Sequence, residues 1–84
     1  MYTVTTDDDS QAQVDALPPE ALAPFAEART MLEVVPWNGR PYHRRSPDGP
    51  MRALSFGPEG RGSLVYLILE DQRRVDLLLV LWIG

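Results

Sequence analysis

The chain contains no cysteine and only one histidine among its 84 residues. Without cysteine there are no disulfides, no thiolate metal sites and no cysteine nucleophile. A structural zinc site is not expected either, because such sites are built from several cysteine and histidine ligands. The sequence therefore predicts no metal and no cofactor, and any catalysis is expected to be metal-free.

Lysine is also absent, so all eight basic residues are arginines. The net charge is −4, but its distribution is uneven. Residues 1–35 hold seven acids and one arginine, whereas residues 36–84 hold seven arginines and five acids. A nucleic-acid-binding domain is normally strongly basic as a whole. Here only the segment from Arg40 to Arg61 is basic, which disfavours tight independent binding to RNA or DNA.

Long apolar runs are missing as well. The longest, Leu64–Leu69 and Leu77–Ile83, fall far short of the roughly 20 residues that cross a bilayer. The first ten residues lack the basic start and apolar centre of a signal peptide. We therefore expect one domain, residues 1–84, in the cytoplasm and away from membranes. A domain this small buries only about 60–65% of its unfolded surface, which favours a homodimer or an obligate partner.

The first half of the chain predicts one strand and two helices. Met1–Thr6 alternates apolar and polar residues, as a half-buried strand does. The aspartates that follow can cap a first helix over Asp8–Ala16. A second helix is predicted from about Pro19 to Val34, with apolar residues at spacings of three and four. We expect the two helices to form a hairpin that packs on a sheet.

The last third predicts three strands joined by short turns: Met51–Phe56, Ser63–Glu70 and Val75–Ile83. Such spacing is typical of an antiparallel meander. The expected fold class is therefore α+β, with the helical hairpin on an antiparallel sheet of about four strands. Regular alternation in the last strand would place Leu77, Leu79 and Leu81 on one face.

The two final strands are apolar on both faces. Helices on one side of a sheet require only one apolar face. The second face is therefore expected to be covered, either by a partner segment or by another copy of the chain. Trp82, Leu79 and Tyr66 are the predicted interface residues, with packing in the core as the alternative for Tyr66 and Trp82.

Residues Trp37–Pro50 (WNGRPYHRRSPDGP) contain several turn signals and are predicted to form an irregular loop rich in arginine. Structureless loops of this length are uncommon in small domains and are often functional. The glycine-rich segment Gly57–Gly62 is predicted to be a turn between strands rather than a phosphate-binding loop, because no helix follows it.

Four segments carry a resemblance to a known family: Trp37–Pro41, Met51–Leu54, Gly62–Tyr66 and Val80–Gly84. With the order strand, two helices, three strands, the chain resembles the RelE/ParE toxin superfamily of bacterial toxin–antitoxin systems. The resemblance implies a toxin that a cognate antitoxin neutralises. RelE-type members cleave mRNA on the ribosome and so inhibit translation, whereas ParE-type members poison DNA gyrase. Ser63 stands where the family often has arginine.

Cleavage of RNA by its own 2′-hydroxyl requires a base, an acid and cations around the phosphate. Histidine is a common general acid or base, and arginine binds phosphate through two parallel N–H donors. The predicted catalytic residues are His43, Arg52 and Arg61, and the predicted phosphate-binding residues are Arg40, Arg44 and Arg45.

Other interpretations stay open at this stage. His43–Arg45 can be a solvated loop, and Arg52 can pair with an acid of the helices. The chain as a whole can be a non-catalytic or gyrase-directed family member that acts as a protein-interaction module. The partners expected from the resemblance are an antitoxin, in a hetero-oligomer, and mRNA on the ribosome.

Overall fold

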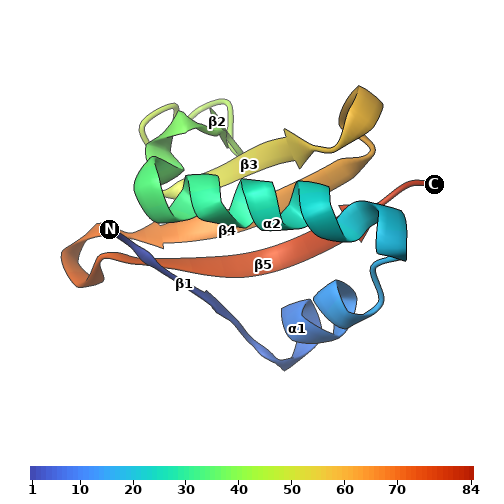
Figure 1. Ribbon diagram of the computed structural model, residues 1–84. Coiled ribbons are helices and arrows are strands. Elements are labelled where there is room, and N and C mark those ends of the chain that lie inside the picture. Colours follow the sequence, from blue (N-terminus) through green and yellow to red (C-terminus); the bar gives the residue numbers. More distant parts are fainter.

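In the computed structural model, which describes residues 1–84, one strand is followed by two helices and then by four strands (Figure 1). The elements are β1 (Thr3–Thr6), α1 (Asp8–Asp15), α2 (Pro19–Val34), β2 (Arg40–Pro41), β3 (Met51–Phe56), β4 (Gly62–Leu69) and β5 (Arg74–Trp82). Single turns of 3-10 helix follow α2, β3 and β4. Neither helix is long and apolar enough to cross a membrane. The α+β class predicted from the sequence is confirmed.

The five strands form one mixed sheet in the order β1-β5-β4-β3-β2. β1 runs parallel to β5, and the other neighbours are antiparallel. The prediction of about four antiparallel strands was therefore incomplete in two respects. β2 lies inside the predicted loop and, with two residues, is too short to show a periodic pattern. The parallel pairing of the first and last strands depends on contacts between the two ends of the sequence.

Local sequence explains where the helices begin. Asp7 accepts a hydrogen bond from the backbone N–H of Ser10, and the Ser10 hydroxyl accepts one from the backbone N–H of Asp7. This reciprocal capping satisfies two backbone donors at the start of α1. Pro19 opens α2, where its missing N–H costs nothing because the first turn has no partner for it.

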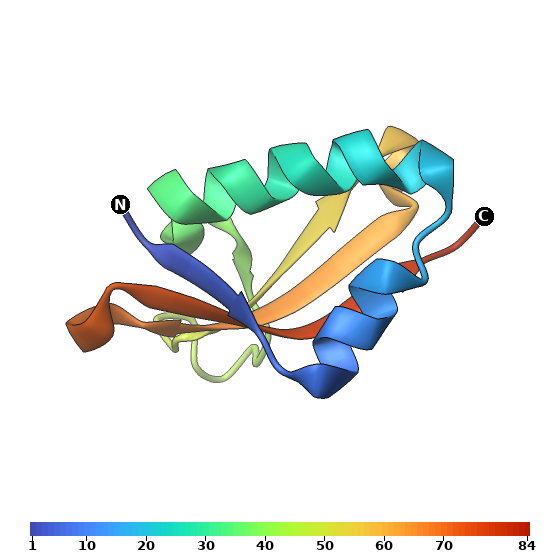
Figure 2. The ribbon, with the colours of Figure 1, turned by 60° about the horizontal axis from the view of Figure 1, so that its bottom comes forward.

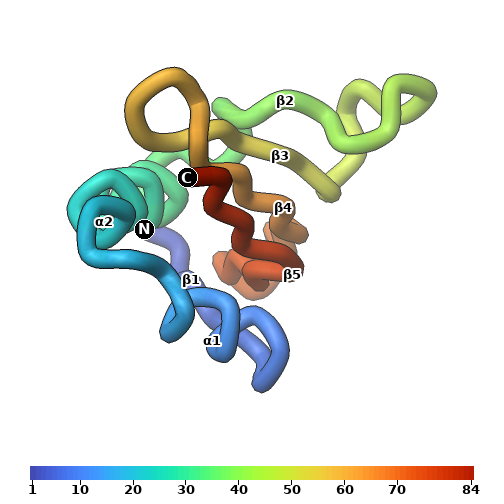
Figure 3. Tube along the Cα trace, turned by 90° about the vertical axis from the view of Figure 1, so that its right-hand side faces the viewer, coloured from blue at the N-terminus to red at the C-terminus, as the bar shows by residue number.

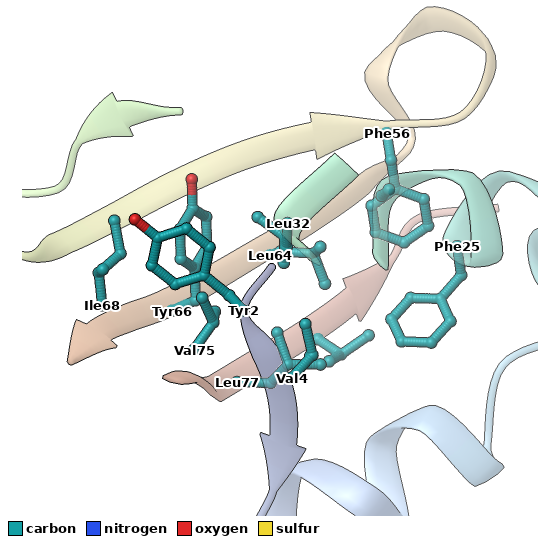
Figure 4. Packing of buried hydrophobic residues seen from close by; sticks show 12 residues of the cluster. Tyr2, Val4, Phe25, Leu32, Phe56, Leu64, Tyr66, Ile68, Val75 and Leu77 are labelled. Atoms are coloured by element: carbon teal, nitrogen blue, oxygen red, sulfur yellow. The ribbon is translucent and has the colours of Figure 1, made fainter. Parts of the chain in front are cut away.

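The core lies between α2 and one face of the sheet (Figures 2 and 4). α2 buries Phe25 and Leu32, which belong to the same cluster as Leu64 and Tyr66 of β4 and Leu77 of β5. The ring of Phe25 meets that of Phe56 edge-on, with centroids 5.9 Å apart. One helix therefore covers one face, and we call this the covered face.

The predicted hairpin of packed helices was wrong in its arrangement. β1 pairs only with Arg74–Leu77, so the rest of β5 would be a free edge. α1 packs against β5 and β1, and the side-chain oxygen of Gln13 accepts a 2.7 Å hydrogen bond from the backbone N–H of Val80. The two helices therefore cover different parts of the sheet, as Figure 2 shows. α1 therefore covers the part of β5 that β1 leaves unpaired. Proteins often cover a free strand edge in this way, because its unpaired N–H and C=O groups could otherwise pair with another chain.

The predicted alternation of β5 also fails at one residue. Leu77 pairs with Tyr66 and Leu79 with Val65, so Leu78 is an extra residue in a β-bulge. Leu77 consequently faces the core, whereas Leu79 faces the opposite side. The prediction that Leu77 and Leu79 share one face was therefore wrong. A run of leucines gives no sign of a bulge, because leucine suits either face.

Candidate functional site

The guanidinium of Arg52 lies inside the loop that follows α2. Its Nη1 donates to the carbonyl oxygens of Pro47 (2.9 Å) and Gly49 (3.3 Å). Its Nη2 donates to those of Gly39 (2.8 Å) and Trp37 (3.3 Å). The residue is only 8% exposed and has no carboxylate partner, so the predicted ion pair with a helix acid is wrong. Arg52 holds both ends of the loop together, and both of its terminal nitrogens are occupied.

His43, Arg44 and Arg45 form the exposed tip of that loop. The tip is a turn, in which the backbone N–H of Ser46 donates to the carbonyl of His43 at 3.0 Å. The ring of Tyr42 stands edge-on to the imidazole, with centroids 5.0 Å apart. Neither arginine has a carboxylate within 4.0 Å. The structure therefore brings these three predicted residues together as free, solvent-facing groups.

Neither Arg40 nor Arg61 lies at the loop tip, and Arg40 pairs in register with Ala53 near the middle of β3. Arg40 is exposed on β2, and its Nη1 is 3.5 Å from the hydroxyl of Ser55. Arg61 follows the turn at the far end of β3, about 17 Å from the loop at a rise of about 3.4 Å per residue. Figure 1 shows the loop and this turn at opposite ends of the strand. The six predicted site residues therefore do not converge on one point.

The face of the sheet opposite α2 carries no helix, as the end-on view in Figure 3 shows, and we call it the open face. Strand register places eight apolar side chains on it or at its bulge: Met51, Ala53, Val65, Leu67, Leu69, Leu78, Leu79 and Leu81. Leu78 is 37% exposed and Leu81 47% exposed. The register thus places apolar residues on both faces of β4 and β5, although Ala53 and Val65 of the open face are already buried within this chain. That a partner or second copy covers the rest stays a prediction.

The three predicted interface residues separate between the two faces. Leu79 lies on the open face and is half-buried. Tyr66 is fully buried on the covered face, where its hydroxyl donates to the carbonyl of Pro36 at 2.7 Å. Burial raises the pKa of this phenol. Trp82 packs beside Phe56 with ring centroids 5.8 Å apart. Tyr66 is therefore a core residue and not an interface residue, and Trp82 serves packing on the same side.

Glu70 is the centre of a polar cluster that sequence reasoning missed. Its Oε1 accepts hydrogen bonds from the hydroxyl of Tyr2 (2.7 Å) and from Nε1 of Trp37 (2.8 Å). Its Oε2 accepts one from Arg73 (2.7 Å). Led by the bond from Trp37, these donors lower the pKa of Glu70 to about 2. The partners are distant in sequence, so no local pattern signals the cluster.

A hollow of about 300 Å³ lies where β1 meets the bulged strand. Its polar lining includes Thr5, Asp7, Arg74 and Asp76. Arg74 donates to both oxygens of Asp76, at 2.8 and 3.2 Å, and this pairing lowers the pKa of that carboxyl. Two carboxylates and one guanidinium leave the hollow with a net negative charge. Register places Thr5 and Asp76 in one row with Met51, and therefore on the open face.

No family model, curated protein or solved structure matches the chain. The functional argument therefore rests on the residues of the chain itself.

Proposed function

We propose that the protein is the toxin-like member of a bacterial toxin–antitoxin pair and that it acts by binding an acidic partner through its arginine-rich segment, residues 40–45. The order of strand, two helices and sheet, together with the Trp37–Pro41 segment, supports the link to RelE/ParE toxins. The single observation that carries the binding proposal is the set of arginines without acidic partners.

The arginines fall into two groups. Arg29, Arg73 and Arg74 each pair with a carboxylate of this chain. Arg40, Arg44, Arg45 and Arg61 are exposed and have no such partner, and Arg52, also without one, is buried against carbonyl oxygens. An unpaired guanidinium binds carboxylate or phosphate groups through two parallel, charge-assisted hydrogen bonds. The segment therefore favours a partner that brings its own negative charge, such as an acidic surface of the cellular target through which the toxin arrests growth.

The loop is also held in one shape before any partner arrives. Arg52 fastens its two ends through four carbonyl oxygens, and the turn at Ser46 fixes its tip. A surface ordered in advance loses less conformational entropy on binding. Arg52 thus supports the segment from behind rather than contacting the partner.

A metal-free endoribonuclease is the second candidate. The adjacency of His43 to Arg44 and Arg45 favours it, because cleavage at a phosphate uses a general acid or base such as an imidazole beside cations. Two positions argue for binding instead: the terminal nitrogens of Arg52 are occupied, and Arg61 lies at the far end of β3. A gyrase-directed toxin is compatible with the binding proposal, since it too acts through a protein contact.

Induction of the chain alone in a bacterial host tests these proposals, with growth and mRNA integrity followed together. We expect growth arrest with intact mRNA, and we expect Arg44→Ala with Arg45→Ala to relieve it. The matched control is Arg29→Ala, an exposed arginine on α2, which should leave the arrest unchanged. Arrest with cleaved mRNA that His43→Ala abolishes would favour the nuclease. Normal growth with folded protein would refute the toxin proposal.

A further inference from the structure

The open face has a basic edge and an acidic edge, and this polarity suggests its occupant. We propose that two copies of the chain pack open face to open face, related by a two-fold axis parallel to the strands. The proposal rests on the sheet itself and does not depend on the toxin function.

The apolar content of the open face supplies the first argument. β4 and β5 place Val65, Leu67, Leu79 and Leu81 there, beside the bulged Leu78. Single exposed apolar residues are ordinary on protein surfaces, but a continuous patch across neighbouring strands marks an interaction site. Burial of such side chains removes apolar surface from water and stabilises association.

The size of the face supplies the second argument. Five strands about 4.8 Å apart make it about 19 Å wide, and eight residues of β4 make it about 26 Å long. The product of these lengths is at most about 500 Å², an area that suits a weak, concentration-dependent dimer rather than the roughly 800 Å² per partner of a standard interface. Two sheets packed in this way form an aligned sandwich with a core about 10 Å thick.

The charges at the two edges supply the third argument and select the symmetry. Arg40, which pairs in register with Ala53, stands at the β2 edge of the open face without an acidic partner. The negatively charged hollow with Asp7 and Asp76 lies at the opposite, β1 edge. A two-fold axis parallel to the strands places the β2 edge of one copy over the β1 edge of the other. Arg40 of each copy then lies over the hollow of the other copy. The two contacts are equivalent, as in any interface formed by a two-fold axis.

The alternative axis, across the strands, would place Arg40 against Arg40. Like charges directly opposed in an interface disfavour it. The polarity of the face is therefore complementary to itself in one orientation only. An unlike partner would need an acidic edge and a basic edge at the same separation. A second copy of the chain has both edges at that separation, because it has the same fold.

Sedimentation equilibrium of the purified protein over a wide concentration range tests the proposal. We expect a monomer–dimer equilibrium. Leu81→Glu should raise the dissociation constant at least tenfold, because it replaces the most exposed leucine of the apolar contact with a charge. The matched control is Leu22→Glu on the outer side of α2, where the leucine is 52% exposed against 47% for Leu81. The control should leave the dissociation constant unchanged.

Arg40 provides a second, electrostatic test. Arg40→Glu should weaken the dimer, most strongly at low salt, whereas Arg40→Lys should largely preserve it. Circular dichroism checks that each variant is folded. A chain that is monomeric at every concentration overturns the proposal and leaves the face to an unlike partner. A dimer that Leu22→Glu disrupts and Leu81→Glu does not would overturn it too. Neither result depends on growth arrest, so failure here is separate from failure of the toxin proposal.

Discussion

Trp37 and Glu70 are joined by a hydrogen bond of 2.8 Å from the indole Nε1 to the carboxylate Oε1, although 33 residues separate them. Tyr2 donates to the same oxygen, and Arg73 binds the other while its guanidinium stacks over the Tyr2 ring at 4.2 Å. One carboxylate therefore joins the start of β1, the turn after α2 and the β4–β5 connection.

The ionised form of Glu70 should make folding dependent on pH in acid. Its pKa is lowered from 4.5 to about 2 in the folded chain, so the unfolded chain takes up the proton first as the pH falls. The stability contributed by the carboxylate is present above about pH 4.5 and is lost toward about pH 2. We expect the free energy of unfolding of Glu70→Gln to fall less steeply than that of the wild type in this window. Urea titrations at several pH values measure it.

Asp71→Asn is the control for that experiment. Asp71 is the exposed neighbour of Glu70, and its side chain makes no hydrogen bond. It should retain the steep acid dependence of the wild type. Equal slopes for the wild type and Glu70→Gln would contradict the role given to Glu70.

Arg52 should be essential to the loop. Arg52→Met keeps much of the apolar stem but leaves four carbonyl oxygens without their donor, so we expect a loss of about 2–4 kcal/mol in the free energy of unfolding. Arg52→Lys should recover only part of this, because an ammonium group lacks the planar fork. Arg44→Ala, at the exposed tip, should change stability by less than about 0.5 kcal/mol. Chemical denaturation distinguishes the three variants.

Gly39 and Tyr66 should be energetically coupled. A methyl group at Gly39 would overlap the Tyr66 hydroxyl and come within 2.8 Å of the Ala53 carbonyl oxygen. Gly39→Ala should therefore cost about 1–3 kcal/mol as an overpacking change, and Tyr66→Phe about 1 kcal/mol through its lost bond to Pro36. In the double variant the overlap with the hydroxyl is gone. Its loss should be smaller than the sum of the two single losses, which a double-mutant cycle measures.

Gln13 should protect one amide of the sheet edge. Its side-chain oxygen accepts the Val80 N–H, which has no strand partner there because β1 ends opposite Leu77. Gln13→Met should expose that donor and accelerate its hydrogen exchange by at least tenfold. The neighbouring Gln11→Met, which removes only surface contacts to Thr6 and Asp15, should leave the rate unchanged. Exchange measured by NMR at Val80 gives the result directly.

Periodic patterns were sufficient to predict most of this fold. The spacing of Phe25, Ala28 and Leu32 predicted α2, and alternation in Met51–Phe56 predicted β3 with the correct faces. The bulge at Leu78 could not be predicted, because every residue around it is an aliphatic one that suits either face. The two-residue β2 has no period at all.

The candidate site was less predictable than the fold, for a related reason. Arg44 and Arg45 have no carboxylate partner although Asp48 lies only three residues after Arg45, so the sequence alone does not determine that they are free. The contacts of Arg52 could not be predicted either, because its partners are carbonyl oxygens, which every residue has. Glu70 is similar: its role depends on Tyr2 and Trp37, whose approach is a result of the completed fold.

The pairing of the first strand with the last has a consequence for synthesis. β1 is made before every other element of the domain, but its only neighbour in the sheet, β5, is made after all of them. Contacts between distant parts of a chain close late and slow its folding. The nascent chain therefore cannot complete its sheet until Trp82 has emerged. Until then β1 has no partner, and any surface that requires the whole sheet, the open face included, is not yet formed.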